Sequence, residues 1–300
     1  MPPRLTAQDF DQDLLLLFDA YVHGDLDRRA FLTQAQRFAK AGVTAAGLLA
    51  ALSPNFAAGQ QVRADDARLL TERVSLPPGA GGAGGMRGYL VRPATADSSR
   101  RRLPPVLVIH ENRGLNPHIE DIARRLALDG FMALAPDALT PVGGYPGDED
   151  KARAAFATLD QGKTRADFVA AAAWLRGRAD GNGKLGAVGF CYGGSIVHWL
   201  ATQLPELNAG VPFYGGSPAP DQAARVKAPL LVHLAGIDER INAAWPAYEA
   251  ALKAAGARVE MHQYPGTQHG FNNDTTPRYD AAAAKLAWER TVAFFKRHLA

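Results

Sequence analysis

From about residue 70 onward, short apolar segments alternate with longer segments of helical character. The segments that predict strands are 86–93, 105–111, 131–137, 184–191, 208–216, 229–236 and 259–265. The segments that predict helices are 118–130, 151–160, 165–180, 194–204, 244–256 and 279–299. The run 105–111 is nearly all apolar and rich in valine and isoleucine, as expected of a strand covered on both faces. This alternation predicts an α/β fold with a mostly parallel sheet and helices on both of its faces.

The first 65 residues follow a different pattern. Apolar residues recur at roughly helical spacing over 5–23, and small apolar residues fill 41–52. Arg28 and Arg29, followed by the later run and by "SPNFAAG", resemble a twin-arginine signal, which would direct the protein to the periplasm. The aspartate-rich segment before the arginines favours amphipathic helices packed on the main domain, and then a cytoplasmic protein. We therefore divide the chain into a helical extension or signal region, 1–65, and an α/β domain, 66–300.

Composition narrows the function classes. The chain has 300 residues, 47% of them apolar and 21% charged, with a net charge of +3. No basic stripe interleaved with aromatic residues appears, so nucleic acid is not an expected partner. No apolar run reaches the roughly 20 residues of a membrane span. The sequence "GAGGAG" at 79–84 matches a dinucleotide-binding pattern, but it precedes a strand and opens no helix, so we interpret it as a flexible hairpin loop.

The only cysteine lies at a notable place, in "KLGAVGFCYGGSIVHWL". An apolar strand leads to Cys191, glycines stand two positions to each side, at Gly189 and Gly193, and a helix follows. This is the pattern of a nucleophile elbow, where small neighbours allow a sharp turn between strand and helix. The elbow would aim the backbone N–H of Tyr192 at a substrate oxyanion, and the N–H of Asn112, on a neighbouring strand, would be the second donor. The alternative is a buried, inert cysteine.

A thiol nucleophile needs a base, and the base needs a group that orients it. Two loops after Cys191 supply candidates in the expected chain order of nucleophile, acid and histidine. Asp238 follows the strand 229–236, and His269 follows the strand 259–265. The competing candidates, all less favourable, are His233 and His262, which lie within strands, and Glu239, which lies beside Asp238.

The chain resembles the dienelactone hydrolase (carboxymethylenebutenolidase) family of α/β-hydrolases over about residues 70–300. The matching motifs are "HENRGLN", "ALAPDAL", "GKLGAVGFCYGGS", "GIDERIN" and "QHGF". The resemblance implies a triad of Cys191, His269 and Asp238 that hydrolyses a small-molecule lactone or ester. It also implies that Glu111 accepts the Cys191 proton when substrate enters. A metal held by Cys191, His269 and Asp238 is disfavoured, and we expect neither a metal nor a cofactor.

The substrate-binding residues depart from the family pattern. Family enzymes that act on dienelactone hold its carboxylate with two arginines, one of them four residues after the triad histidine. That position is Asn273 here. Arg153 falls in the region of the other arginine, and Arg113 beside Glu111 is a further candidate cation. Two alternatives therefore stay open: a broad carboxylesterase with another substrate, and a non-catalytic protein of this fold that binds a small molecule.

Overall fold

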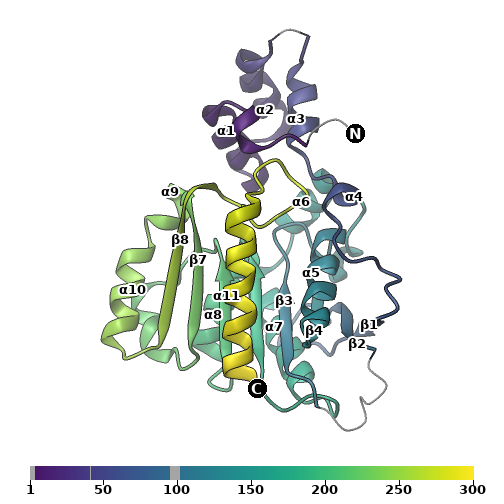
Figure 1. Ribbon diagram of the computed structural model, residues 1–300, viewed down its shortest axis with the longest axis vertical. Helices are drawn as coiled ribbons and strands as arrows, with labels where there is room; N and C mark the ends of the chain where they lie inside the picture. The colour runs from purple at the N-terminus through teal and green to yellow at the C-terminus, as the bar shows by residue number, and fades with distance from the viewer. Residues whose placement is uncertain (1–3, 41, 95–101) are drawn as a thin grey trace.

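The computed structural model describes residues 4–40, 42–94 and 102–300. Within them, eight strands form one sheet in the order β1-β2-β4-β3-β5-β6-β7-β8 (Figure 1). The strands are β1 (Leu69–Ser75), β2 (Arg87–Pro93), β3 (Pro105–Ile109), β4 (Met132–Asp137), β5 (Gly186–Phe190), β6 (Ala209–Phe213), β7 (Leu230–Ile237) and β8 (Val259–Gln268). β2 pairs antiparallel with β1 and β4, and the other pairings between these strands are parallel. The predicted mostly parallel sheet is confirmed.

Helices cover both faces of the sheet. The helices of this domain are α5 (Pro117–Leu128), α6 (Glu149–Ala157), α7 (Gln161–Arg176), α8 (Tyr192–Gln203), α9 (Glu239–Asn242), α10 (Trp245–Ala254) and α11 (Ala281–Leu299). Alternate side chains of a strand point to opposite faces. Leu107 and Ile109 of β3 therefore pack with α7 and α8, whereas Val106 and Val108 pack with α5 and α11. Every segment predicted to be a helix or a strand overlaps an element of that type.

The glycine-rich segment 79–84 joins β1 to β2, which run antiparallel, so the predicted hairpin connection is confirmed. Its backbone is held by the domain, because the N–H groups of Gly79 and Ala83 donate to the carboxylate of Asp167 on α7. The sequence did not predict β1. Only Leu69 and Val74 of that strand are buried, so its pattern carries little apolar periodicity.

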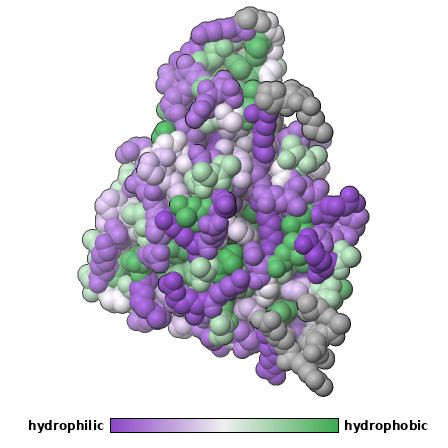
Figure 2. Space-filling model, in the orientation of Figure 1, coloured by the Kyte–Doolittle hydropathy of each residue, from purple (hydrophilic) through white to green (hydrophobic). Residues whose placement is uncertain are grey.

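The N-terminal extension folds into short helices at one end of the sheet (Figure 1). They are η1 (Ala7–Asp9), α1 (Gln12–His23), α2 (Arg28–Ala35), η2 (Gln36–Phe38), α3 (Ala45–Leu52) and α4 (Phe56–Gly59). Their buried apolar residues, among them Phe18 and Phe31, form a core of their own, separate from the two cores of the sheet. Figure 2 shows the extension projecting from the α/β domain. Its predicted boundary at residue 65 and the export signal stay predictions.

Among the described residues, no helix has the length and apolar character needed to span a membrane.

Candidate active site

Cys191 occupies a sharp turn between β5 and α8. Its backbone has φ 54° and ψ −112°, a conformation that residues other than glycine rarely adopt. A Cβ atom added to Gly189 would lie 2.1 Å from the carbonyl oxygen of Gly193, and one added to Gly193 would lie 2.2 Å from that of Ile109. Only glycine fits at either position, which is the physical reason for the pattern seen in the sequence. The turn places the thiol at the carboxyl end of the sheet.

Asp238 and His269 lie together beside the thiol. Asp238 follows β7 and begins α9, and His269 follows β8, as the sequence predicted. The Nδ1 atom of His269 lies 2.6 Å from Oδ2 of Asp238, and both side chains are buried. The Nε2 atom of His269 has no hydrogen-bond partner among the described residues, and it lies within 4.8 Å of Sγ of Cys191. The imidazole is thus fixed by the carboxylate, with its other nitrogen free to act on the thiol or a substrate.

The charges around this pair favour a thiolate opposite an imidazolium. Burial alone would raise the pKa of Cys191, but the positive charge of two histidines outweighs it and lowers that pKa to about 6. Burial would lower the pKa of His269, and the Cys191 and Asp238 charges instead raise it to about 10. Between these values, the thiol is ionised and the histidine carries a proton.

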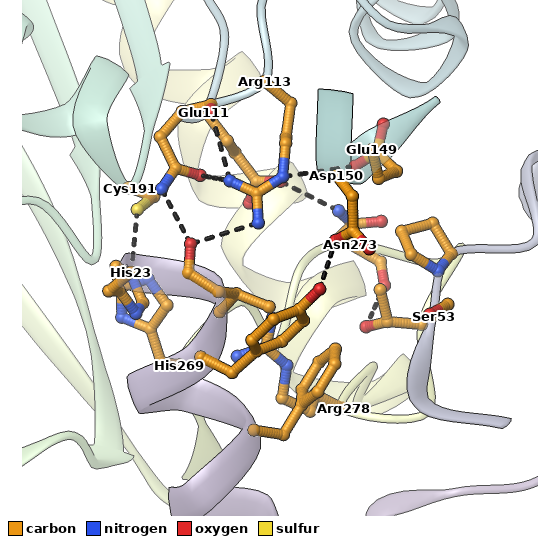
Figure 3. Close-up of a pocket in the computed structure, with 16 residues that line it drawn as sticks. His23, Ser53, Glu111, Arg113, Glu149, Asp150, Cys191, His269, Asn273 and Arg278 are labelled. Carbon is orange, nitrogen blue, oxygen red and sulfur yellow. Dashed lines mark hydrogen bonds and ion pairs between the residues drawn. The ribbon is translucent and has the colours of Figure 1, made fainter. Parts of the chain in front are cut away.

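The second of the two histidines, His23, was not predicted from the sequence. It ends α1 of the extension, and its Nε2 atom lies 3.3 Å from Sγ of Cys191 (Figure 3). Its Nδ1 atom lies 2.8 Å from the carbonyl oxygen of Asp19 and 3.3 Å from Oδ2 of the same residue. Asp19 and His23 are spaced i,i+4 on a helix, but no sequence feature relates them to a cysteine 168 positions away.

Glu111 and Asn273 form a polar pair in the same cavity. The side-chain N–H of Asn273 donates to Oε2 of Glu111 at 3.1 Å. No hydrogen bond joins Glu111 to Cys191 among the described residues, although both line the cavity. The thiol therefore contacts His23 in this structure, and the part that the family resemblance gives to Glu111 stays a prediction.

The predicted oxyanion-hole residues lie at the expected ends of their elements. Tyr192 is the first residue of α8, and its hydroxyl donates to Gln161, which leaves only its backbone N–H for a role at the thiol. Asn112 lies just beyond β3, and its side chain donates to the carbonyl of Val22 in α1. Their roles in binding an oxyanion stay predictions.

The two candidate arginines differ in position. Arg113 is buried and lines the cavity, where it donates to Asn112 and to the carbonyl of Val22. Arg153 instead donates to the carbonyls of Tyr21 and Leu26, and its guanidinium lies over the Tyr21 ring. Arg153 thus holds the extension, and its guanidinium is engaged there. Its predicted contact with substrate stays a prediction.

The competing candidates lie away from the thiol in interactions of their own. His233 is fully buried in β7 between Thr291 and the Tyr264 hydroxyl. His262 on β8 pairs with Glu260, and Glu239 is an exposed residue at the start of α9. None of these three residues lines the cavity above Cys191.

Three side chains in the site have the donor atoms to hold a metal ion. The ligand atoms of His23, Cys191 and His269 all lie within 4.8 Å of one another. This set differs from the disfavoured one considered in the sequence, because His23 takes the place of Asp238, which instead orients His269. Thiolate and imidazole suit zinc, so a soft or borderline cation fits this donor set.

A cysteine on a strand-to-helix turn, an aspartate after β7 and a histidine after β8, on a mostly parallel sheet, match the arrangement of an α/β-hydrolase. The model of the dienelactone hydrolase family matches residues 86–299, and a YqhI-like model matches residues 1–40. The chain belongs to the dienelactone hydrolase family, and it is a carboxylic ester hydrolase.

Relatives and solved structures agree with this assignment. A protein of Escherichia coli, provisionally named a carboxymethylenebutenolidase, is 34% identical over 71% of this chain and 83% of its own. A protein of the same provisional name from Methylorubrum extorquens is 30% identical over 91% of this chain and 98% of its own. The crystal structure of a provisionally assigned dienelactone hydrolase from Klebsiella pneumoniae is 31% identical, with a TM-score of 0.67 over 76% of this chain and 99% of that one.

Proposed function

We propose that the protein hydrolyses a lactone or small carboxylic ester through an acyl-enzyme on Cys191, with His269 and Asp238 completing a triad. The observation that carries this proposal is the thiol on a strained turn beside a buried histidine, whose other nitrogen lies 2.6 Å from a buried carboxylate. Structural cysteines are inert when buried among apolar groups alone, whereas this thiol faces two imidazoles.

The reaction proceeds in two steps. The Cys191 thiolate attacks the carbonyl carbon, and the backbone N–H groups of Tyr192 and Asn112 stabilise the oxyanion. As the C–O bond breaks, imidazolium His269 gives its Nε2 proton to the leaving oxygen. A water molecule then attacks the thioester while His269 takes a proton from it. The carboxylic acid leaves, and the thiolate and imidazolium are restored.

A carboxylate-bearing substrate such as dienelactone is supported by Arg113. This cation is buried in the cavity wall, 3.8 Å from Glu149 and without a closer carboxylate among the described residues. Asn273, at the position of the family arginine, hydrogen-bonds Glu111 and offers no positive charge. The absence of an arginine at this position favours the alternative of a broad carboxylesterase.

The test uses the full-length protein with p-nitrophenyl acetate and a dienelactone. Wild type should turn over at least one of them, and rapid quenching followed by mass spectrometry should find the acyl group on the peptide that contains Cys191. Cys191→Ala and His269→Ala should each lose activity, while His262→Ala, in the strand that precedes His269, should keep it. Wild-type rates in Cys191→Ala would contradict the proposal. Tight binding without turnover would favour the non-catalytic alternative.

A further inference from the structure

We propose that His23, supplied by the N-terminal extension, is a catalytic residue that takes the proton of the Cys191 thiol and so forms the thiolate nucleophile. This inference rests on the proposed function, which it extends by adding a second base from a different part of the chain. The family mechanism needs only the histidine after β8 and a carboxylate near the thiol. Here the extension brings another imidazole into direct contact with sulfur.

Two Asp–His pairs face one thiol. His269 is held at Nδ1 by Asp238, and His23 is held at Nδ1 by Asp19. The two ring centroids are 4.7 Å apart and the rings are nearly perpendicular (Figure 3). The Nε2 atom of His23 lies 3.3 Å from Sγ of Cys191, and a ring nitrogen of His269 lies within 4.8 Å of the same sulfur. A histidine whose Nδ1 is fixed by an acceptor presents Nε2 as its acid–base atom.

The hydrogen-bond partners of His23 determine the tautomer of its neutral form. The Asp19 carbonyl can only accept a hydrogen bond, so the Nδ1 atom, 2.8 Å away, carries a proton. A guanidinium can only donate, so Nη2 of Arg240, 3.0 Å from Nε2, requires a lone pair on Nε2. Neutral His23 thus carries its one lone pair on Nε2, which accepts from Arg240 and lies 3.3 Å from Sγ of Cys191. This neutral form takes the thiol proton once Arg240 turns away, and the transfer leaves the thiolate beside an imidazolium.

The proton transfer is balanced within the site. The S–H bond breaks, its proton forms an N–H bond at Nε2 of His23, and the electron pair stays on sulfur. The new imidazolium is neutralised by Asp19, which Arg278 holds at 3.0 Å. Arg240 is 43% exposed and can turn into solvent, which frees the lone pair of Nε2 for the thiol proton. Among the described residues no hydrogen bond joins Glu111 to Cys191 in this structure, and Asn273 donates to Oε2 of that carboxylate.

The charged groups that face His23 support an ion pair. Burial would lower the pKa of His23, but the Cys191 thiolate and the Asp19 carboxylate outweigh it and raise that pKa above its ordinary value. The charge of His269 opposes this rise in the pKa of His23. Two further cations, Arg240 and Arg278, face the same group by pairing with Asp19. The thiolate and Asp19 are the nearer partners.

The extension is placed to act as part of the active site. It meets the α/β domain through polar contacts close to the thiol, including Gln12 with Gln268 and Arg28 with Asp150. The cavity enclosed beneath it has a volume of only about 60 Å³, whereas pockets for small molecules usually measure about 300–1,000 Å³. His23 thus forms one wall of a small acyl-binding space, and a large substrate requires that wall to move.

The test compares His23→Gln and His23→Ala with His262→Ala, all in the full-length protein. The first variant keeps the size of the side chain but cannot take a proton, and the third removes an imidazole that is outside the cavity. The pH dependence of Cys191 alkylation by iodoacetamide reports thiol ionisation without any ester. We expect its midpoint, about pH 6 in wild type, to rise by about one unit in both His23 variants. It should not change in His262→Ala.

Turnover gives the second measurement. General-base catalysis is typically worth about 10²–10⁴-fold, so kcat/KM near pH 7 should fall about 100-fold in His23→Gln. Added imidazole should restore part of the activity of His23→Ala by occupying the space vacated, and should not help His23→Gln. Unchanged alkylation and turnover in folded His23→Gln would overturn this inference alone. Activity that survives Cys191→Ala would instead overturn the proposed function.

Discussion

The Nε2 atom of His23 lies 3.3 Å from Sγ of Cys191, so a helix of the N-terminal extension reaches the thiol of the α/β domain. His269 approaches the same sulfur from the loop after β8. The thiol therefore lies between two histidines, each anchored by an aspartate. This arrangement lowers the pKa of the Cys191 thiol and raises that of His269.

The pH dependence of turnover should be bell-shaped. The two histidines lower the pKa of Cys191 to about 6, and the charges of Cys191 and Asp238 raise that of His269 to about 10. Activity should rise as pH increases through about 6, because thiolate forms, and fall as pH increases through about 10, because His269 loses the proton needed by the leaving group. The measurement is kcat/KM against pH. A single rise near the ordinary thiol pKa of about 8.5 would show that the thiol is not activated.

Replacing Asp238 should lower turnover far more than replacing its neighbour Glu239. Asp238→Asn should lower kcat by about 10³–10⁴-fold, because an amide no longer fixes the Nδ1–H tautomer or stabilises the imidazolium of His269. Glu239→Gln is the matched control, since Glu239 is exposed and directs no side chain into the cavity. Steady-state kinetics of both variants decide the assignment. Equal losses in the two would mean that the acid of the triad has been misidentified.

The glycine after the elbow gives a prediction about stability. A Cβ atom at position 193 would lie 2.2 Å from the backbone oxygen of Ile109, which cannot move without disturbing the sheet. Gly193→Ala should therefore lower the free energy of unfolding by about 3 kcal/mol or more, and it should abolish turnover. Gly47→Ala, at an exposed position in the first turn of α3, should instead raise the free energy of unfolding by about 0.5–1 kcal/mol. Denaturant unfolding measures both changes, and a tolerated Gly193→Ala would contradict the close packing.

The sequence predicted the α/β domain and the order of its elements, because buried strands and amphipathic helices each leave a local periodic signal. The elbow was predicted from its glycines between a strand and a helix. The loops that carry Asp238 and His269 were predicted from chain order and from the ends of the strands before them. His23 could not be found in this way. Its contact with Cys191 depends on how one folded unit docks on another, and Asp19 and His23 alone indicate only a polar pair on a helix. β1 was missed because four of its consecutive residues are exposed.

The converging donors predict reversible inhibition by zinc. The ligand atoms of His23, Cys191 and His269 lie within 4.8 Å of one another, and a bound cation would occupy both the nucleophile and its base. Zn²⁺ should therefore inhibit the wild type, a chelator should restore activity, and His23→Ala should weaken the inhibition at least about tenfold. Co²⁺ should give a thiolate charge-transfer band in wild type alone. Equal inhibition of wild type and His23→Ala would show that His23 is not a ligand.

The choice between a carboxylate-bearing substrate and a plain ester depends on Arg113. This buried guanidinium lines the cavity, whereas Arg153 is engaged by the carbonyls of Tyr21 and Leu26. A hydrogen bond to a charged group contributes about 1.5–3 kcal/mol, so Arg113→Met should lower kcat/KM for a dienelactone about 10- to 100-fold more than kcat/KM for p-nitrophenyl acetate. Arg153→Met should lower kcat/KM for both substrates alike, because it loosens the helix that carries His23. If Arg113→Met lowers kcat/KM for both substrates equally, the arginine supports the fold of the site and does not bind the substrate carboxylate.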